Sequence, residues 1–222
     1  MKRSCLMVAV LVAAALLALS RCGTVTAVTP LYRGESALAV SVGGPVTNVA
    51  DLKIPLPYAV ARYRYGLSDQ AGLYAGGHLL TAGFSVVGID LGFSYHFLKQ
   101  SGWVPCVGAS AGLAVFIEPG GEEAMFPQLD ATASYRLGDR FTTYFGAQSM
   151  YQFSRTPYVV FAPLVGGRFR LGRSLSVGLE AKWYAPTEPT EPRNVHYPLG
   201  VANHGAIGFV LGADWQFGGN HE

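Results

Sequence analysis

The sequence is poor in charge, in cysteine and in long apolar runs, and each shortage excludes a class of protein. Only 14% of its 222 residues are charged, against about 25% in an ordinary soluble domain, so its surface is not that of a soluble enzyme. Three cysteines are too few for a disulfide-stapled miniprotein. Half of the residues are hydrophobic and the 28 glycines have no period of three, which excludes disorder and collagen. Lysine and arginine do not cluster, so we expect no nucleic-acid partner.

The N-terminus is typical of a secretory signal. Two basic residues, Lys2 and Arg3, precede an apolar run of 15 residues, Cys5–Leu19, which is shorter than the roughly 20 that a membrane-spanning helix needs. Two cleavage sites compete. One lies after Ala27, and the other precedes Cys22 in a segment that is similar to the bacterial lipoprotein box, where Cys22 would be lipidated.

These two sites predict a signal peptide over residues 1–21, or 1–27 if ordinary signal peptidase cleaves. Cleavage before Cys22 removes three basic residues and leaves thirteen basic against fourteen acidic ones, so the net charge changes from +2 to −1. The mature protein is therefore close to neutral.

Beyond residue 27 the chain has no run of 18 apolar residues, so no membrane-spanning helix is predicted there. Stretches of about ten residues instead alternate between apolar and small or polar side chains, with turn residues between them, and this predicts strands. Eight strands remain the alternative, because the first stretch is short and the third is weakened by glycine. The ten predicted strands are Ala37–Gly43, Tyr58–Gly66, Ala71–Leu80, Val87–Phe97, Trp103–Phe116, Met125–Leu137, Phe141–Phe153, Val159–Leu171, Leu175–Ala185 and Ile207–Phe217.

The connections between these strands alternate in length. Four are tight turns, and five others, such as Gly44–Pro57 and Pro186–His204, are mostly longer. Bacterial outer-membrane barrels have an even number of antiparallel strands, short periplasmic turns and longer external loops. Ten strands with both termini in the periplasm place all four tight turns on one side. The pattern predicts an all-β fold: a closed antiparallel transmembrane barrel in the outer membrane.

The composition of the two strand faces indicates which one meets lipid. A soluble barrel of lipocalin type needs a solvent face rich in lysine and glutamate, yet only three lysines follow residue 27, and the polar face is mostly small residues. The bulky apolar face therefore suits hydrocarbon. Two groups of aromatic residues at opposite strand ends fit the belts of such barrels; they are Tyr63, Tyr65, Tyr95, Phe97, Trp103, Tyr135, Phe141, Trp215 and Phe217 at the tight-turn ends, and Tyr151, Phe153, Phe161 and Trp183 towards the other.

The final strand carries the most specific motif. Gly212, Trp215 and Phe217 match a glycine-x-x-aromatic-x-aromatic pattern, and with it the chain resembles the small bacterial outer-membrane β-barrel proteins, the class of the outer-membrane protein A transmembrane barrel. The resemblance implies outer-membrane lipid and the barrel assembly machinery as partners. It also implies a division into a periplasmic tether over 22–34, a barrel over 35–217 and a periplasmic tail over 218–222, which extends beyond the usual terminal aromatic.

The strongest functional feature is a set of charged residues on the predicted inner face. Ionisable groups enclosed by a membrane barrel are costly unless they are paired or hydrated, and ten strands leave an interior that side chains can largely fill. We therefore expect a filled, salt-bridged lumen; a narrow channel for small solutes that slightly favours anions is the alternative. The set comprises Arg62, Arg64, Asp90, Asp130, Arg136, Arg168, Arg170, Glu180, Lys182 and Asp214.

Enzymatic chemistry ranks third among the hypotheses. An outer-membrane hydrolase needs a nucleophile and a base within about 3 Å, and Ser94 with His96 offers only an alternating spacing near the periplasmic end. Glu188, Glu191, His196 and His204 in the last connection match no metal-ligand spacing. Cys106 is expected to pack on the inner face. We expect a structural or surface-interaction role, with no catalysis, cofactor or metal. A small solute or a surface ligand remains a possible partner.

Overall fold

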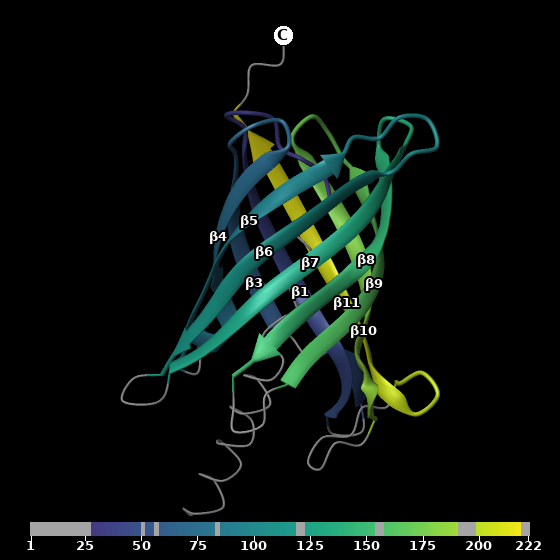
Figure 1. Ribbon diagram of the computed structural model, residues 1–222. Coiled ribbons are helices and arrows are strands. Elements are labelled where there is room, and N and C mark those ends of the chain that lie inside the picture. Colours follow the sequence, from purple (N-terminus) through teal and green to yellow (C-terminus); the bar gives the residue numbers. More distant parts are fainter. Residues whose placement is uncertain are drawn as a thin grey trace, which may run out of the picture.

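The computed structural model describes residues 28–49, 52–55, 58–82, 85–118, 123–153, 158–190 and 199–218. Within these residues ten strands form a closed antiparallel barrel (Figure 1), so the predicted fold and strand number are confirmed. The barrel strands are β1 (Ser36–Val49), β3 (Tyr58–Gly66), β4 (Ala71–His78), β5 (Val87–Leu98), β6 (Cys106–Ile117), β7 (Glu123–Leu137), β8 (Phe141–Gln152), β9 (Tyr158–Arg170), β10 (Leu175–Pro189) and β11 (His204–Phe217).

The barrel closes because β1 pairs with strands on both sides. Ser36 is the register partner of Tyr65 in β3 and of Phe217 in β11. The first strand therefore begins, and the last strand ends, at the same rim. Every other strand pairs with its neighbours in the sequence, as a meander of antiparallel hairpins does.

The first strand is longer than its sequence pattern predicted. It runs past Gly43 to Val49 and there leaves the barrel to pair with the short strand β2 (Leu52–Pro55). Gly43 has φ +141°, and a Cβ at this position would collide with the backbone of Phe209. The strand bends where only glycine fits, and the alternation of side chains that guided the sequence analysis is lost beyond that point.

The strand β10 also extends beyond its predicted end, to Pro189. Its register with β11 shifts between Tyr184 and Pro189, next to Ala185 with φ 49°. Part of the predicted last loop is therefore a hairpin that projects from the barrel at the same end as β1 and β2 (Figure 1). The four tight turns occupy the opposite end, and the helical turn α2 (Leu79–Ala82) lies in the connection between β4 and β5.

The outside of the barrel is apolar and the inside is polar at mid-height. Leu91, Phe145 and Leu211 on the outer face are 56%, 57% and 59% exposed, whereas Asp90 and Glu180 on the inner face are fully buried. A soluble barrel has the reverse arrangement. In lipid, a closed barrel satisfies the backbone hydrogen bonds of every strand, so this exterior is a membrane-facing surface.

The aromatic residues at the tight-turn end lie on the outer face, where they form part of an interface belt. Trp103 is 95% exposed, and Trp215 and Phe217 lie side by side on β11 with ring centroids 6.5 Å apart. Phe153 and Phe161 are exposed towards the other end. Among the described residues, no helix is both long enough and apolar enough to cross a membrane.

Candidate functional site

The centre of the barrel interior contains a set of ion pairs. Arg62 Nε lies 2.6 Å from Asp90 Oδ2, and Lys182 Nζ lies 2.9 Å from Glu180 Oε1. Asp214 accepts from two arginines, Arg64 at 2.5 Å and Arg168 at 3.0 Å. All of these side chains are buried or nearly so. Seven of the ten charged residues singled out in the sequence are thus in direct contact.

Glycines on intervening strands allow these side chains to meet. Arg62 on β3 and Asp90 on β5 are both register partners of Gly76 on β4, and the arginine reaches across it. In the same way Tyr144 on β8 reaches across Gly166 to donate a 3.0 Å hydrogen bond to Glu180. A side chain at either glycine would occupy the space of the group that crosses it. The high glycine content therefore has a packing role.

Two of the interior arginines also lie close to the rings of interior tyrosines. The guanidinium of Arg62 lies 5.6 Å from the ring centre of Tyr74, and that of Arg168 lies 5.7 Å from the ring centre of Tyr144. These distances are within the range of cation–π attraction. Lys182 also donates a hydrogen bond to Gln148. Asp130, another of the singled-out residues, accepts a 2.9 Å hydrogen bond from Ser110, its register partner.

Aromatic and aliphatic side chains fill the interior at the end opposite the tight turns. One cluster comprises Tyr58, Val60, Ala162, Tyr184 and Ala206, and a second comprises Val86, Ala114, Phe116, Phe126 and Met150. Between them lies the buried ring of His78, which is hydrogen-bonded to Tyr58 and lies 4.7 Å from the ring of Phe116. We name these residues the outer apolar layer.

Sequence reasoning did not identify the outer apolar layer or His78. The available signal was the alternation itself, because Tyr58 and Val60 share the inner face with Arg62, and Phe116 shares it with Ser110. Large apolar residues on both faces of a strand end mark a place where the interior is apolar too.

The segment before β1 enters the barrel from the tight-turn end. Val28 is fully buried against Tyr144 and Leu164, and its carbonyl accepts a 2.8 Å hydrogen bond from Ser134. Leu31 is buried as well. Residues 28–34 were assigned by the sequence analysis to a periplasmic tether, and of these 28–31 lie within the interior. Residues 22–27 of the tether, Cys22 among them, lie outside the described residues, as does the signal peptide.

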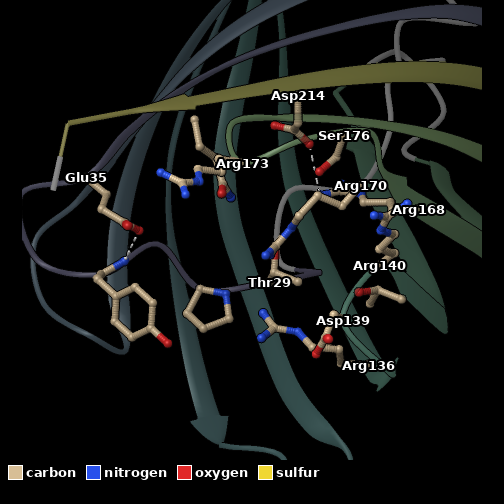
Figure 2. Close-up of a pocket in the computed structure, with 14 residues that line it drawn as sticks. Thr29, Glu35, Arg136, Asp139, Arg140, Arg168, Arg170, Arg173, Ser176 and Asp214 are labelled. Carbon is tan, nitrogen blue, oxygen red and sulfur yellow. Dashed lines mark hydrogen bonds and ion pairs between the residues drawn. The ribbon is translucent and has the colours of Figure 1, made fainter. Parts of the chain in front are cut away.

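A polar pocket opens at the tight-turn end beside this segment (Figure 2). Its volume is about 150 Å³. Five arginines line it, Arg136, Arg140, Arg168, Arg170 and Arg173, against three carboxylates, Glu35, Asp139 and Asp214. We call this pocket the arginine vestibule. It contains Arg136 and Arg170, two of the three singled-out charges that stay outside the central ion pairs; the third is Asp130.

The remaining candidate residues are spread over the barrel. His96 is buried near the tight-turn end, and Ser94 Oγ donates to the carbonyl of Gly72 at 3.5 Å. Cys106 is half-buried opposite Ser134. His204 is exposed and contacts the carbonyl of Ala202, while Glu191 and His196 lie outside the described residues.

The residues of the terminal motif occupy both faces of β11. Trp215 and Phe217 point outwards to the lipid side, and Gly212 lies on the inner face opposite Ser41. Recognition of this strand by the assembly machinery stays a prediction. Of the tail, only Gly218 is described.

No protein-family model and no curated protein matches this sequence. Solved structures similar to the chain are bacterial outer-membrane barrels. The translocator domain of the autotransporter NalP from Neisseria meningitidis has 10% identity, coverage of 97% of this chain and 98% of the other, and a TM-score of 0.42. OprG from Pseudomonas aeruginosa has 9% identity, coverage of 86% of this chain and 99% of the other, and a TM-score of 0.36. The outer membrane protease OmpT from Escherichia coli has 12% identity, coverage of 84% of this chain and 94% of the other, and a TM-score of 0.38.

The strand topology and the two faces of the sheet define the class of this protein. Ten antiparallel strands close on themselves, their outer face is apolar with aromatic residues at both ends, and their inner face holds the ionisable groups. The chain is an outer-membrane β-barrel.

Proposed function

We propose that this barrel does not conduct and that it has a structural and surface-interaction role in the outer membrane. The observation that carries the proposal is that the chain's own residues occupy the interior at three levels. The outer apolar layer occupies one end, the ion pairs occupy the centre, and the segment 28–31 enters the other end.

The small circumference of the barrel favours a closed interior. Ten strands enclose little more space than their own inward side chains fill, whereas the aqueous porins use 16 to 18 strands. Aromatic rings take up the room that the glycines leave: Phe116 lies over Gly88, and Tyr184 lies over Gly208, each 2.6 Å from the position of a Cβ. A hydrated path for solutes would have to displace these rings.

Two projecting hairpins support the surface-interaction part of the proposal. The hairpin of β1 and β2 and the outer part of the β10–β11 hairpin extend beyond the barrel rim. The latter is held by a 2.9 Å hydrogen bond from Trp183 Nε1 to the carbonyl of His204 and by one of 3.0 Å from the Thr190 amide to Asn203. This end faces outwards if the tight turns face the periplasm. Ordered projections there provide a surface for a partner.

Planar-bilayer recording of the purified mature protein tests the closed interior. We expect no unitary current steps, while the same preparation shows the heat-modifiable gel migration of a folded barrel. Reproducible single-channel steps would contradict the proposal. If those steps also show a reversal potential shifted towards that of chloride, the narrow anion-favouring channel is the correct description.

A further inference from the structure

The arginine vestibule brings together cationic side chains from four parts of the chain. Arg136 ends β7, Arg140 lies in the turn to β8, Arg168 and Arg170 end β9, and Arg173 lies in the turn to β10. These strands are neighbours in the barrel, so their ends meet at one rim. Figure 2 shows Arg136, Arg170 and Arg173 pointing their guanidinium groups into the pocket.

The vestibule has more positive than negative charge, and two of its three carboxylates already have partners. Asp214 is held by Arg64 and Arg168, and Glu35 accepts a 2.7 Å hydrogen bond from the amide of Tyr32. In the part of the chain that the structure describes, Arg136, Arg140, Arg170 and Arg173 make no ion pair with a carboxylate. A recess with an excess of positive charge attracts anions.

The geometry and size of the vestibule select the chemistry of the ligand. Guanidinium groups bind phosphate and carboxylate oxygens through two parallel hydrogen bonds, and Thr142, Ser176 and Gln216 add neutral polar groups to the wall. The volume of about 150 Å³ corresponds to about five water molecules at roughly 30 Å³ each. It is smaller than the roughly 300 Å³ or more of sites for drug-sized ligands. The guanidinium groups and the volume of the vestibule favour a compact oxyanion.

We propose that the arginine vestibule is a binding site for a phosphate group on the periplasmic side of the barrel. The group is either free phosphate or the phosphate of a lipid headgroup that leans over the rim. The site shares Arg168 and Asp214 with the central ion pairs, but it lies at the mouth, so binding there needs no path through the barrel. The two proposals can therefore fail independently: a conducting barrel could bind phosphate at this site, and a closed barrel could lack phosphate binding.

Isothermal titration of the purified mature protein in an uncharged maltoside detergent tests this site. One arm uses inorganic phosphate and the other uses dihexanoyl phosphatidylglycerol below its critical micelle concentration. We expect saturable binding in at least one arm, and the tighter arm identifies the source of the phosphate. Affinity should decrease as sodium chloride is raised, because the contacts are ionic.

The matched variants separate the vestibule from general surface charge. Replacing Arg170 and Arg173 together with glutamine removes two guanidinium groups that take no part in the central ion pairs. Charge-assisted hydrogen bonds of this kind lower the dissociation constant by about tenfold or more each, so the double variant should bind at least tenfold more weakly. Arg33→Gln, an exposed arginine outside the vestibule lining, is the control and should bind as the unmodified protein does.

Three results would overturn the proposal: no saturable binding in either arm, equal affinity in the double variant, or an equal loss in Arg33→Gln. Both altered residues of the double variant lie at a tight turn or strand end rather than in the central ion pairs. Heat-modifiable migration of each variant confirms that the barrel is folded before it is titrated.

Discussion

The substitution Gly76→Ala tests directly whether interior charges pair across an intervening strand. Gly76 lies between Arg62 and Asp90 in the register, and a Cβ there would overlap the Asp90 carboxylate and lie 2.6 Å from Cγ of Arg62. Overpacking of a close-packed interior costs about 1–3 kcal/mol. Disrupting a buried ion pair costs up to about 3–5 kcal/mol. The added methyl group both overpacks the interior and displaces the Arg62–Asp90 pair. We therefore expect Gly76→Ala to lower the free energy of unfolding by about 2–5 kcal/mol.

The adjacent residue supplies the matched control. Gly77 is on the lipid face of the same strand, and the nearest atom to a Cβ there is the carbonyl oxygen of Gly88 at 4.0 Å. Gly77→Ala makes the same change in backbone freedom, but its methyl group does not enter the interior. We therefore expect the free energy of unfolding to change by no more than about 0.5 kcal/mol. Both variants are measured by urea unfolding in lipid vesicles, followed by tryptophan fluorescence and by heat-modifiable migration.

A double-mutant cycle completes the test. In a background that carries Arg62→Ala and Asp90→Ala, the groups that the new methyl displaces are gone, and Gly76→Ala should cost less than in the unmodified protein. Equal losses for Gly76→Ala and Gly77→Ala would refute the reasoning. An undiminished loss in the alanine background would show that the backbone, not the ion pair, sets the cost.

Two further predictions concern a buried charge and the N-terminal cysteine. Asp90→Asn removes the negative charge that faces buried Arg62 and should lower the free energy of unfolding by about 3–5 kcal/mol. Asp69→Asn should change it by less than about 1 kcal/mol, because the contact of Asp69 with Lys99 is exposed and 4.0 Å long; equal urea midpoints for the two variants would contradict this difference. For lipidation, radioactive palmitate should label the unmodified protein and not Cys22→Ala, and equal label in both would remove the lipoprotein prediction.

The packing of the interior explains why this chain combines many glycines with long inward side chains. Each long inward side chain needs a place where its neighbouring strand carries none, and glycine provides it at Gly76 and Gly166. Arg62 and Tyr144 then reach partners two strands away. A substitution at such a glycine therefore acts on residues that are distant in the sequence.

The barrel itself could be predicted from the sequence because its signals are local. Alternation with period two assigns each residue of Val87–Leu98 to one face without knowledge of any partner strand, and the alternating lengths of the connections order the strands into hairpins. The same signals did not predict where some strands end. The extension of β1 beyond Gly43 and of β10 beyond Tyr184 depends on pairing outside the barrel, which a periodic pattern does not contain.

The sequence by itself thus determined the fold class and which face of the strands meets lipid, and it favoured ten strands over eight. Only the tertiary structure decided which charges meet. Arg62 and Asp90 are 28 residues apart, and Arg64 and Asp214 are 150 apart, so their pairing follows from strand register and closure, which long-range contacts set. The entry of Val28 into the interior and the meeting of five arginines at one rim have the same origin. Composition and alternation are properties of single strands, whereas a binding site in a barrel is a property of several strands brought to one place.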